Sequence, residues 1–249
     1  MNYFSGPSHL GDATWTLHAL RKIGGGHHFY TPEEYHWQLR DLIAGTMITL
    51  HPHENIPEDA KCSWIGCQRF QNQGVVWSNG PDVVDFLMRW NNCMCRENGV
   101  EPRFNDRWSM LADWPAIQIP ADDGGGFDVL VVNCPPRSGQ CLRWDQGEMD
   151  ELIQEIGKRY DTVVTNPTTA TSVRQITRSL SQIGNLHLQA QFTVAIASGA
   201  HWGCHSVWSQ EKPLYLFLDD PLRLDYGRQI PHHGLVSGMR QQLISEGWL

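Results

Sequence analysis

Short apolar segments alternate with amphipathic helical segments along nearly the whole chain, and this alternation constrains the fold most. The runs 127–133 and 192–197 are almost continuously apolar, which is typical of strands buried on both faces. The segment 80–97 places apolar residues at helical spacing, from Val83 to Met94. Strands that alternate with helices favour parallel sheets covered by helices on both faces. The pattern therefore predicts an α/β fold.

We predict the following elements from apolar periodicity and from turn residues. Strands are expected near 2–5, 27–30, 46–50, 62–66, 127–133, 162–165, 192–197 and 214–218, with 214–218 the last strand. Helices are expected near 12–23, 32–44, 80–97, 147–159 and 235–246, and a further helix carries Val173, Ile176, Leu180 and Ile183 on one face.

The segment 120–126, Pro-Ala-Asp-Asp-Gly-Gly-Gly, is the clearest boundary in the sequence. Consecutive glycines flanked by acids and a proline are typical of a linker or hinge. The strand–helix pattern restarts after it. We therefore predict an N-terminal domain over 1–122 and a C-terminal domain over 127–249. Both are expected to be Rossmann-like and to face each other across a cleft.

Charge and hydropathy exclude several classes of function. The 249 residues include 19 basic and 27 acidic side chains, for a formal net charge of −8. Proteins that depend on phosphate-backbone contacts are normally basic, so nucleic acid is disfavoured as the main partner. No apolar run approaches the roughly 20 residues of a membrane span, and the N-terminus lacks the layout of a signal peptide. We expect a cytoplasmic protein without a transmembrane segment.

Cysteine and histidine patterns do not predict a metal site. The seven cysteines are an odd number and lack the CxxC spacing of zinc knuckles, so we expect small, buried, reduced side chains. The histidine pairs 27–28 and 232–233 and the pattern His51-x-His53 are suggestive, and His51 and His53 could chelate an ion from one extended segment. No third ligand is spaced convincingly, and we predict that no metal is bound.

The first candidate site lies where the strand 2–5 passes through a Gly/Pro/Ser turn into a helix. A glycine such as Gly11 lets the backbone approach a ligand closely, and the free N–H groups of a helix start attract anions. Asp12 stands where the helix dipole keeps a carboxylate ionised. It could take a proton from a hydroxyl as a general base. It could equally be the N-cap of the helix.

The second candidate site follows the strand 192–197 and contains Ser198, Gly199, Ala200 and His201. Backbone N–H groups at a helix start could hold an anion there, with a hydroxyl and an imidazole beside them. The alternative is a tight turn with a capping serine. Arg137, in the loop 134–140, could neutralise the same anion or could be a solvated surface residue. Weaker candidates are Arg143, Trp144 and the turn Asn166-Pro167.

These motifs resemble a known family. Gly11-Asp12 before a helix that ends in Ala19-Leu20-Arg21 resembles the opening of the ADP-heptose:lipopolysaccharide heptosyltransferases and of related short phage and bacterial glycosyltransferase-like proteins. The stretch 197–203, followed by a proline-initiated strand at 213–217, is similar to their "D-[ST]-G-x-x-H-L-A" loop.

The resemblance implies a GT-B fold and metal-independent transfer of a sugar from a nucleotide-diphospho-sugar to a hydroxyl acceptor. No cofactor is implied, because the nucleotide-sugar is a substrate. Asp12 would be the catalytic base, and Gly11 would lie in an acceptor- or phosphate-side loop. The resemblance places Ser198, Gly199, Ala200 and His201 around the donor diphosphate, and Arg137 could assist them.

Two departures from the family pattern leave other functions open. Ala197 stands where the family has an acid, and one residue instead of two separates Gly199 from His201. A non-catalytic nucleotide or sugar-phosphate binding protein of the same fold is one alternative. A sugar-nucleotide epimerase is another, and it would need acids or bases on both faces of the sugar. An enzyme that glycosylates modified DNA bases is disfavoured by the acidic net charge.

Overall fold

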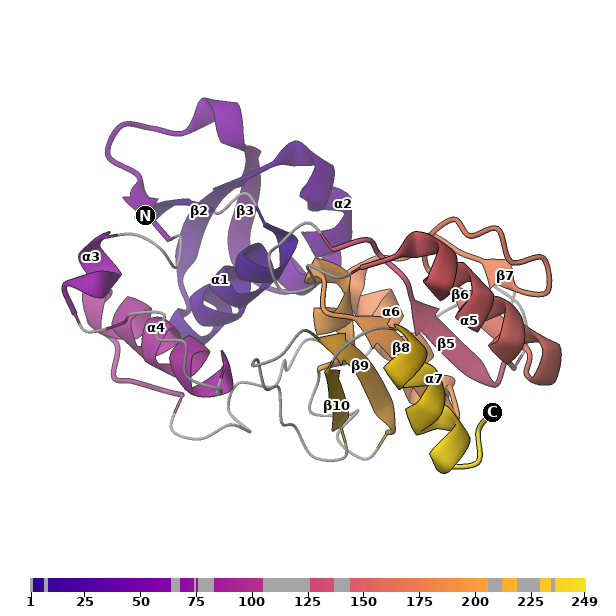
Figure 1. The fold of residues 1–249 in the computed structure, drawn as a ribbon. Coiled ribbons are helices and arrows are strands. Elements are labelled where there is room, and N and C mark those ends of the chain that lie inside the picture. The colour runs from indigo at the N-terminus through magenta and orange to yellow at the C-terminus, as the bar shows by residue number, and fades with distance from the viewer. Residues whose placement is uncertain are drawn as a thin grey trace. The chain divides into compact units, whose positions relative to one another are not determined.

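A computed structural model of the chain divides into two compact units, Met1–Trp114 and Pro115–Leu249 (Figure 1). The structure describes residues 2–6, 9–63, 68–73, 75, 83–104, 126–136, 144–205, 212–218, 229–233 and 236–249. Residues 120–125 of the expected linker lie outside this part. Each unit contains its own sheet, and each is described by itself.

The sheet of the first unit is parallel, as the sequence predicts. Its strands are β1 (Asn2–Ser5), β2 (Gly26–Thr31), β3 (Met47–Pro52) and β4 (Lys61–Cys62), in the order β3-β2-β1-β4. The helices α1 (Leu10–Ile23) and α4 (Val83–Glu97) pack against each other, and α3 (Gln68–Gln71) is short. Phe4, Leu17, Phe29 and Trp90 have no exposed surface and form the core.

The connection between β2 and β3 is not the single helix expected over 32–44. It is a chain of short turns: η1 (Glu33–Tyr35), α2 (His36–Leu39) and η2 (Arg40–Ile43). Aromatic and histidine side chains at positions 35–37 are weak helix formers, which explains why one regular helix does not form. Arg21 at the end of α1 donates a 2.6 Å hydrogen bond to the carbonyl of Leu42 and fixes this connection to α1.

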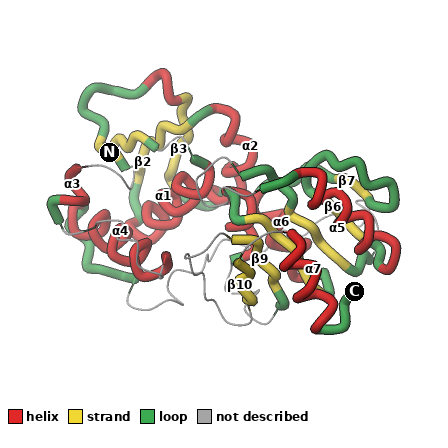
Figure 2. The backbone as a smooth tube through the Cα atoms, viewed as in Figure 1, coloured by secondary structure: helices red, strands yellow, loops and turns green. Residues whose placement is uncertain are grey.

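The second unit has a larger parallel sheet, seen with its helices in Figure 2. Its strand order is β10-β9-β8-β5-β6-β7. The strands are β5 (Val129–Val132), β6 (Thr162–Val164), β7 (Arg174–Gln175), β8 (Phe192–Ile196), β9 (Leu214–Leu218) and β10 (Gln229–His233). The helices are α5 (Gln146–Arg159), α6 (Leu180–Gln189), the 3-10 helix η6 (Gly199–Cys204) and α7 (Val236–Ser245). Every residue of β5 and β8 is buried, as their apolar runs predict.

Two predictions for this unit are wrong. Val173 and Ile176 do not belong to a helix, because they flank β7, and α6 begins only at Leu180. The backbone N–H of Ser179 donates to the side chain of Gln182, the arrangement of a capping box that starts a helix at this point. Strand 214–218 is not the last strand, because β10 pairs with β9 in parallel. In the first unit, β4 covers only residues 61–62, and positions 64–66 of the expected strand lie outside the described residues.

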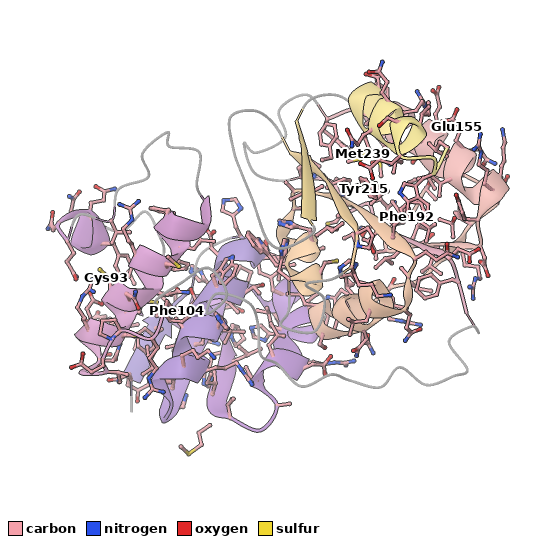
Figure 3. The ribbon with its side chains drawn as sticks, turned by 90° about the horizontal axis from the view of Figure 1, so that it is seen from below. Cys93, Phe104, Glu155, Phe192, Tyr215 and Met239 are labelled. Carbon is pink, nitrogen blue, oxygen red and sulfur yellow. The ribbon has the colours of Figure 1, made fainter. Side chains whose placement is uncertain are left out.

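The C-terminal residues anchor onto the second sheet through aromatic contacts. The ring of Phe192 lies 5.9 Å from that of Tyr215, and both residues are labelled in Figure 3. The ring of Trp248 lies 4.4 Å from that of Phe192. The indole N–H of Trp248 donates a 2.6 Å hydrogen bond to the Tyr215 hydroxyl. The Tyr160 hydroxyl donates to the carbonyl of Trp248 at 3.0 Å, and the Tyr215 hydroxyl donates to Glu246. The last residues of the chain therefore complete this core.

Two of the cysteines that the structure describes differ from expectation. Cys62 is disulfide-bonded, and Cys134 is a free thiol that is only partly buried. Cys93, Cys95 and Cys204 are buried free thiols, as expected. Burial raises the pKa of the Cys95 and Cys204 thiols, which keeps them protonated. None of the helices that the structure describes is long and apolar enough to cross a membrane.

Candidate active site

Ligands of open parallel sheets bind beyond the carboxyl ends of the strands, where the strand order reverses. In the second unit this point lies between β5 and β8, because β6 and β7 extend the sheet on one side and β9 and β10 on the other. The chain leaves these two strands as residues 133–136 and 197–204. The predicted turn of Ser198, Gly199, Ala200 and His201 therefore lies at the switch point of this sheet.

Ser198 has the features of a ligand-facing residue. Its backbone N–H donates to the carbonyl of Ile196 at 2.7 Å, and the neighbouring Ala197 N–H extends the pairing to β9. Its side chain precedes η6 but does not cap it. The Ser198 hydroxyl is buried and has no hydrogen-bond partner in the part of the chain that the structure describes. A buried polar group without a partner is costly, so this hydroxyl is suited to bind a ligand oxygen.

Gly203 fixes the turn onto α6 and was not found by sequence reasoning. A Cβ at this position would lie 2.4 Å from the carbonyl oxygen of Leu180 and 3.2 Å from Ile183. Only glycine fits, and η6 can therefore pack directly on the start of α6. Gly199, at the other end of η6, stays partly exposed, so the open end of the turn is the one that begins at Ser198.

His201 does not supply positive charge to this turn. Its side chain is 1% exposed, and burial lowers its pKa to about 4, so the ring is neutral at pH 7. Its Nδ1 contacts the carbonyl of Ser198, which can only accept a hydrogen bond. The proton of the neutral ring therefore lies on Nδ1, and Nε2 is an acceptor. His201 supports the backbone of the turn, and an anion would have to be held by other groups.

Among the remaining candidate residues of the second unit, the structure describes Trp144 and the turn Asn166-Pro167. Arg137 and Arg143 lie outside the described residues. The Trp144 ring packs edge-on against Phe217 at 5.9 Å, which gives it a structural contact. Asn166 lies directly beyond β6 and is bonded to Asn133, which is fully buried and follows β5. Sequence reasoning found Asn166 as a turn residue and missed its partner.

The switch point of the first unit lies between β1 and β4. The Ser63 N–H and hydroxyl both donate to the carbonyl of Ser5, at 2.9 and 2.7 Å. A Cβ at Gly6 would lie 2.7–2.8 Å from the Phe29 ring and the carbonyl of Tyr30. Glycine is therefore required where the chain turns away from the sheet toward α1.

Asp12 lies in the first turn of α1, which follows this switch-point turn. The N-cap of α1 is His9, so the alternative in which Asp12 is the cap is wrong. Burial raises the pKa of the Asp12 carboxyl from 3.8 to about 6, and the nearby His9 only partly opposes this. Within the described residues the carboxylate accepts no hydrogen bond. Desolvation thus makes Asp12 more basic than the sequence indicates, although the carboxylate is still mostly ionised at pH 7. Gly11, beside it, is partly exposed.

Two histidines of the first unit, His28 and His51, contact each other. Nδ1 of His28 lies 2.7 Å from Nε2 of His51, and the His51 ring stacks on Tyr30 at 4.8 Å. The Nε2 atom of His51 therefore contacts His28 and not His53. The described residues hold no group of three or more His, Cys, Asp or Glu side chains that could bind a metal ion.

Several solved structures with a similar fold are glycosyltransferases. The chain aligns with the E. coli heptosyltransferase WaaC, solved with ADP, with a TM-score of 0.54 and 11% identity over 98% of this chain and 99% of that chain. A glycosyl transferase family 9 protein from Veillonella parvula gives 0.52 and 12% over 98% and 88%. The iron-containing dodecameric glycosyltransferase TibC from enterotoxigenic E. coli gives 0.55 and 14% over 93% and 62%.

These similarities establish the fold along nearly the whole chain. No family model and no curated protein sequence matches the chain. The fold is therefore similar to that of these glycosyltransferases. The heptosyltransferases to which the sequence motifs point are among the structures it resembles.

Proposed function

We propose that the protein is a glycosyltransferase that moves a sugar from a nucleotide-diphospho-sugar to a hydroxyl acceptor. The observation that carries this proposal is Asp12, a carboxylate with a pKa of about 6 in the helix turn that follows a strand switch point. A general base works best when its pKa lies near the working pH. The fold supports the proposal, because several solved structures that share it are glycosyltransferases.

Asp12 would accept the proton of the acceptor hydroxyl while that oxygen attacks the anomeric carbon of the donor. The bond from the anomeric carbon to the diphosphate oxygen breaks, and its electron pair leaves with the nucleoside diphosphate. The backbone at Gly11 would allow the acceptor or a phosphate to approach Asp12 closely. In this proposal the first unit binds the acceptor and the second unit binds the donor.

The turn after β8 would stabilise the departing diphosphate without a metal. The unpartnered hydroxyl of Ser198 and the backbone N–H groups at Gly199 and Ala200 are the donors we assign to it. Arg137 would add the positive charge that the neutral His201 does not provide. His201 would keep the turn in shape through its contact with the Ser198 carbonyl.

The proposal is tested by ligand binding and then by turnover. Ligands that bind only the folded state raise its thermal stability. Sugar nucleotides of adenine, uracil, guanine and cytosine should therefore be screened by thermal shift, and those that bind should be tested for release of the nucleotide in the presence of sugar acceptors. We expect Asp12→Asn to lower turnover by about 10²–10⁴ with little change in donor affinity. Release that is unaffected by Asp12→Asn would show that another group is the base.

Binding without transfer is the second candidate function. Ala197 is buried where the similar family has an acid, which favours loss of catalysis in an intact binding fold. Nucleotide-sugar binding at the Ser198 turn, with no transfer to any acceptor and no effect of Asp12→Asn, would identify this function.

A further inference from the structure

The segment 165–172, which follows β6, is a surface loop rich in threonine and serine, and its residues 167, 169, 171 and 172 are exposed. Exposed loops are usually the more mobile parts of a domain. This loop is instead bonded to buried or partly buried side chains of neighbouring elements at several points.

Asp150 provides three of these bonds, from Thr168 and Thr169. It lies on α5 and is 8% exposed. One carboxylate oxygen accepts from Thr168 Oγ1 and Gln146 Nε2, both at 2.8 Å. The other oxygen accepts from the backbone N–H and the hydroxyl of Thr169, at 3.0 and 2.8 Å. Burial alone would raise the pKa of Asp150, but these hydrogen bonds outweigh it and lower the pKa, so the carboxylate remains charged.

Asn133 holds the start of the loop beside β5. Its side-chain carbonyl accepts from the Asn166 N–H at 2.8 Å, and its amide donates to the Asn166 carbonyl at 3.0 Å. The Thr165 N–H donates to the carbonyl of Val131 at 3.1 Å, which continues the pairing of β6 with β5. The position of the loop is therefore set from the strand at the switch point.

The place of the loop in the sheet indicates what it would contact. In doubly wound sheets the phosphates of a bound nucleotide lie at the switch point, and the nucleoside reaches the end of the strand beside the first strand. In this unit β5 is the first strand, and β6 is its neighbour on the side away from β8. The loop after β6 therefore occupies the nucleoside position.

We propose that Asp150 is a positioning residue for the nucleoside of the donor: through Thr168 and Thr169 it holds the 165–172 loop in the shape that receives the nucleoside. This inference rests on the proposed function, since it presupposes that the second unit binds a nucleotide. A loop that is ordered in advance does not lose conformational freedom on binding, and affinity is higher for that reason. Asp150 itself is buried under the loop and does not touch the ligand.

The test compares nucleoside diphosphates with inorganic pyrophosphate. Binding of ADP, UDP, GDP, CDP and pyrophosphate is measured by calorimetry on the whole protein, first on the wild type and then on Asp150→Asn. We expect the tightest nucleoside diphosphate to bind about tenfold more weakly to the variant, while pyrophosphate affinity changes less than about twofold. Hydrogen exchange of the Thr169 amide should become faster, since its acceptor is weakened.

Asp161→Asn is the matched control. Asp161 precedes β6 at the opposite end of the strand, and its exposed carboxylate pairs with Arg174 at 3.0 Å. The same chemical change there should leave both affinities as in the wild type. Thr169→Val is the second variant, because it removes one hydroxyl from the loop without touching α5. We expect Thr169→Val to bind the nucleoside diphosphate about threefold more weakly than the wild type.

Faster exchange of the loop in Asp150→Asn with unchanged nucleoside diphosphate affinity would overturn the inference. An equal loss of pyrophosphate affinity would also overturn it, because it would show general damage to the unit. If Asp150→Asn does not fold, an unchanged affinity in Thr169→Val has the same consequence. If the wild type binds none of the four nucleotides, the proposed function itself fails, and that result is distinguished because it precedes any variant.

Discussion

Asp12→Asn should make the protein more stable while it removes the proposed catalytic base. Burial raises the pKa of this carboxyl from 3.8 to about 6, so holding it ionised in the folded state costs free energy. The full shift corresponds to roughly 3 kcal/mol at most, since one pKa unit is roughly 1.4 kcal/mol. Asp12 is only partly buried, and solvent screening reduces this cost. We expect the neutral isostere to raise the free energy of unfolding at pH 7.5 by about 1–2 kcal/mol.

The stability gained in Asp12→Asn should become smaller as the pH falls. Between pH 3.8 and about 6 the folded state binds more protons at Asp12 than the unfolded state does. The wild type therefore loses stability as the pH rises through this window, and its stability levels off above it. The Asn variant has no such dependence. The difference between the two should be complete above about pH 7, clearly reduced at pH 5 and absent below about pH 3.5. For the same reason kcat/KM of the wild type should fall about tenfold per unit below pH 6.

Urea unfolding of both proteins at pH 5 and pH 7.5 measures this difference. Asp41→Asn is the control in the same unit, because Asp41 lies in the surface connection beside Arg40, at 3.6 Å. It should change stability by less than about 0.5 kcal/mol at either pH. A loss of stability in Asp12→Asn at pH 7.5, or a gain that does not depend on pH, would refute the reasoning that desolvation sets the pKa of Asp12.

Three further outcomes follow from the second unit. Ser198→Ala should lower turnover about tenfold. Urea unfolding should show no loss of stability, since the Ser198 hydroxyl has no hydrogen-bond partner to lose in the described structure. A less stable variant would contradict this. Gly203→Ala should reduce the unfolding free energy by about 2 kcal/mol, because its Cβ would lie 2.4 Å from the Leu180 carbonyl; unchanged stability would show that α6 can move away. Truncation after Ser245 removes Trp248 from the core. It should reduce the free energy of unfolding by about 2–4 kcal/mol and the melting temperature in calorimetry by several degrees. An unchanged transition would contradict the anchoring described for the C-terminus.

Much of the fold could be predicted from the sequence because local patterns are strong where strands are fully buried. The apolar runs that became β5 and β8 and the helical stripes of α4 and α5 were found close to their observed bounds. Errors occurred where local periodicity was ambiguous. Val173 and Ile176 have helical spacing from Leu180, but the pairing of the Ile176 N–H with the carbonyl of Val164 places the chain beside β6. Only a contact distant in sequence decides between the two.

For the candidate site too, the sequence predicted some features and the tertiary structure decided the others. The sequence by itself determined which segments follow buried strands, and therefore where Asp12 and Ser198 stand along the chain. The tertiary structure decided which strands are neighbours, and so which turns lie at a switch point. It also decided the chemistry of each group: Asp12 became more basic and His201 neutral because burial removes water from around them. Solvation depends on everything packed around a side chain, and that packing comes from parts of the chain far away in sequence.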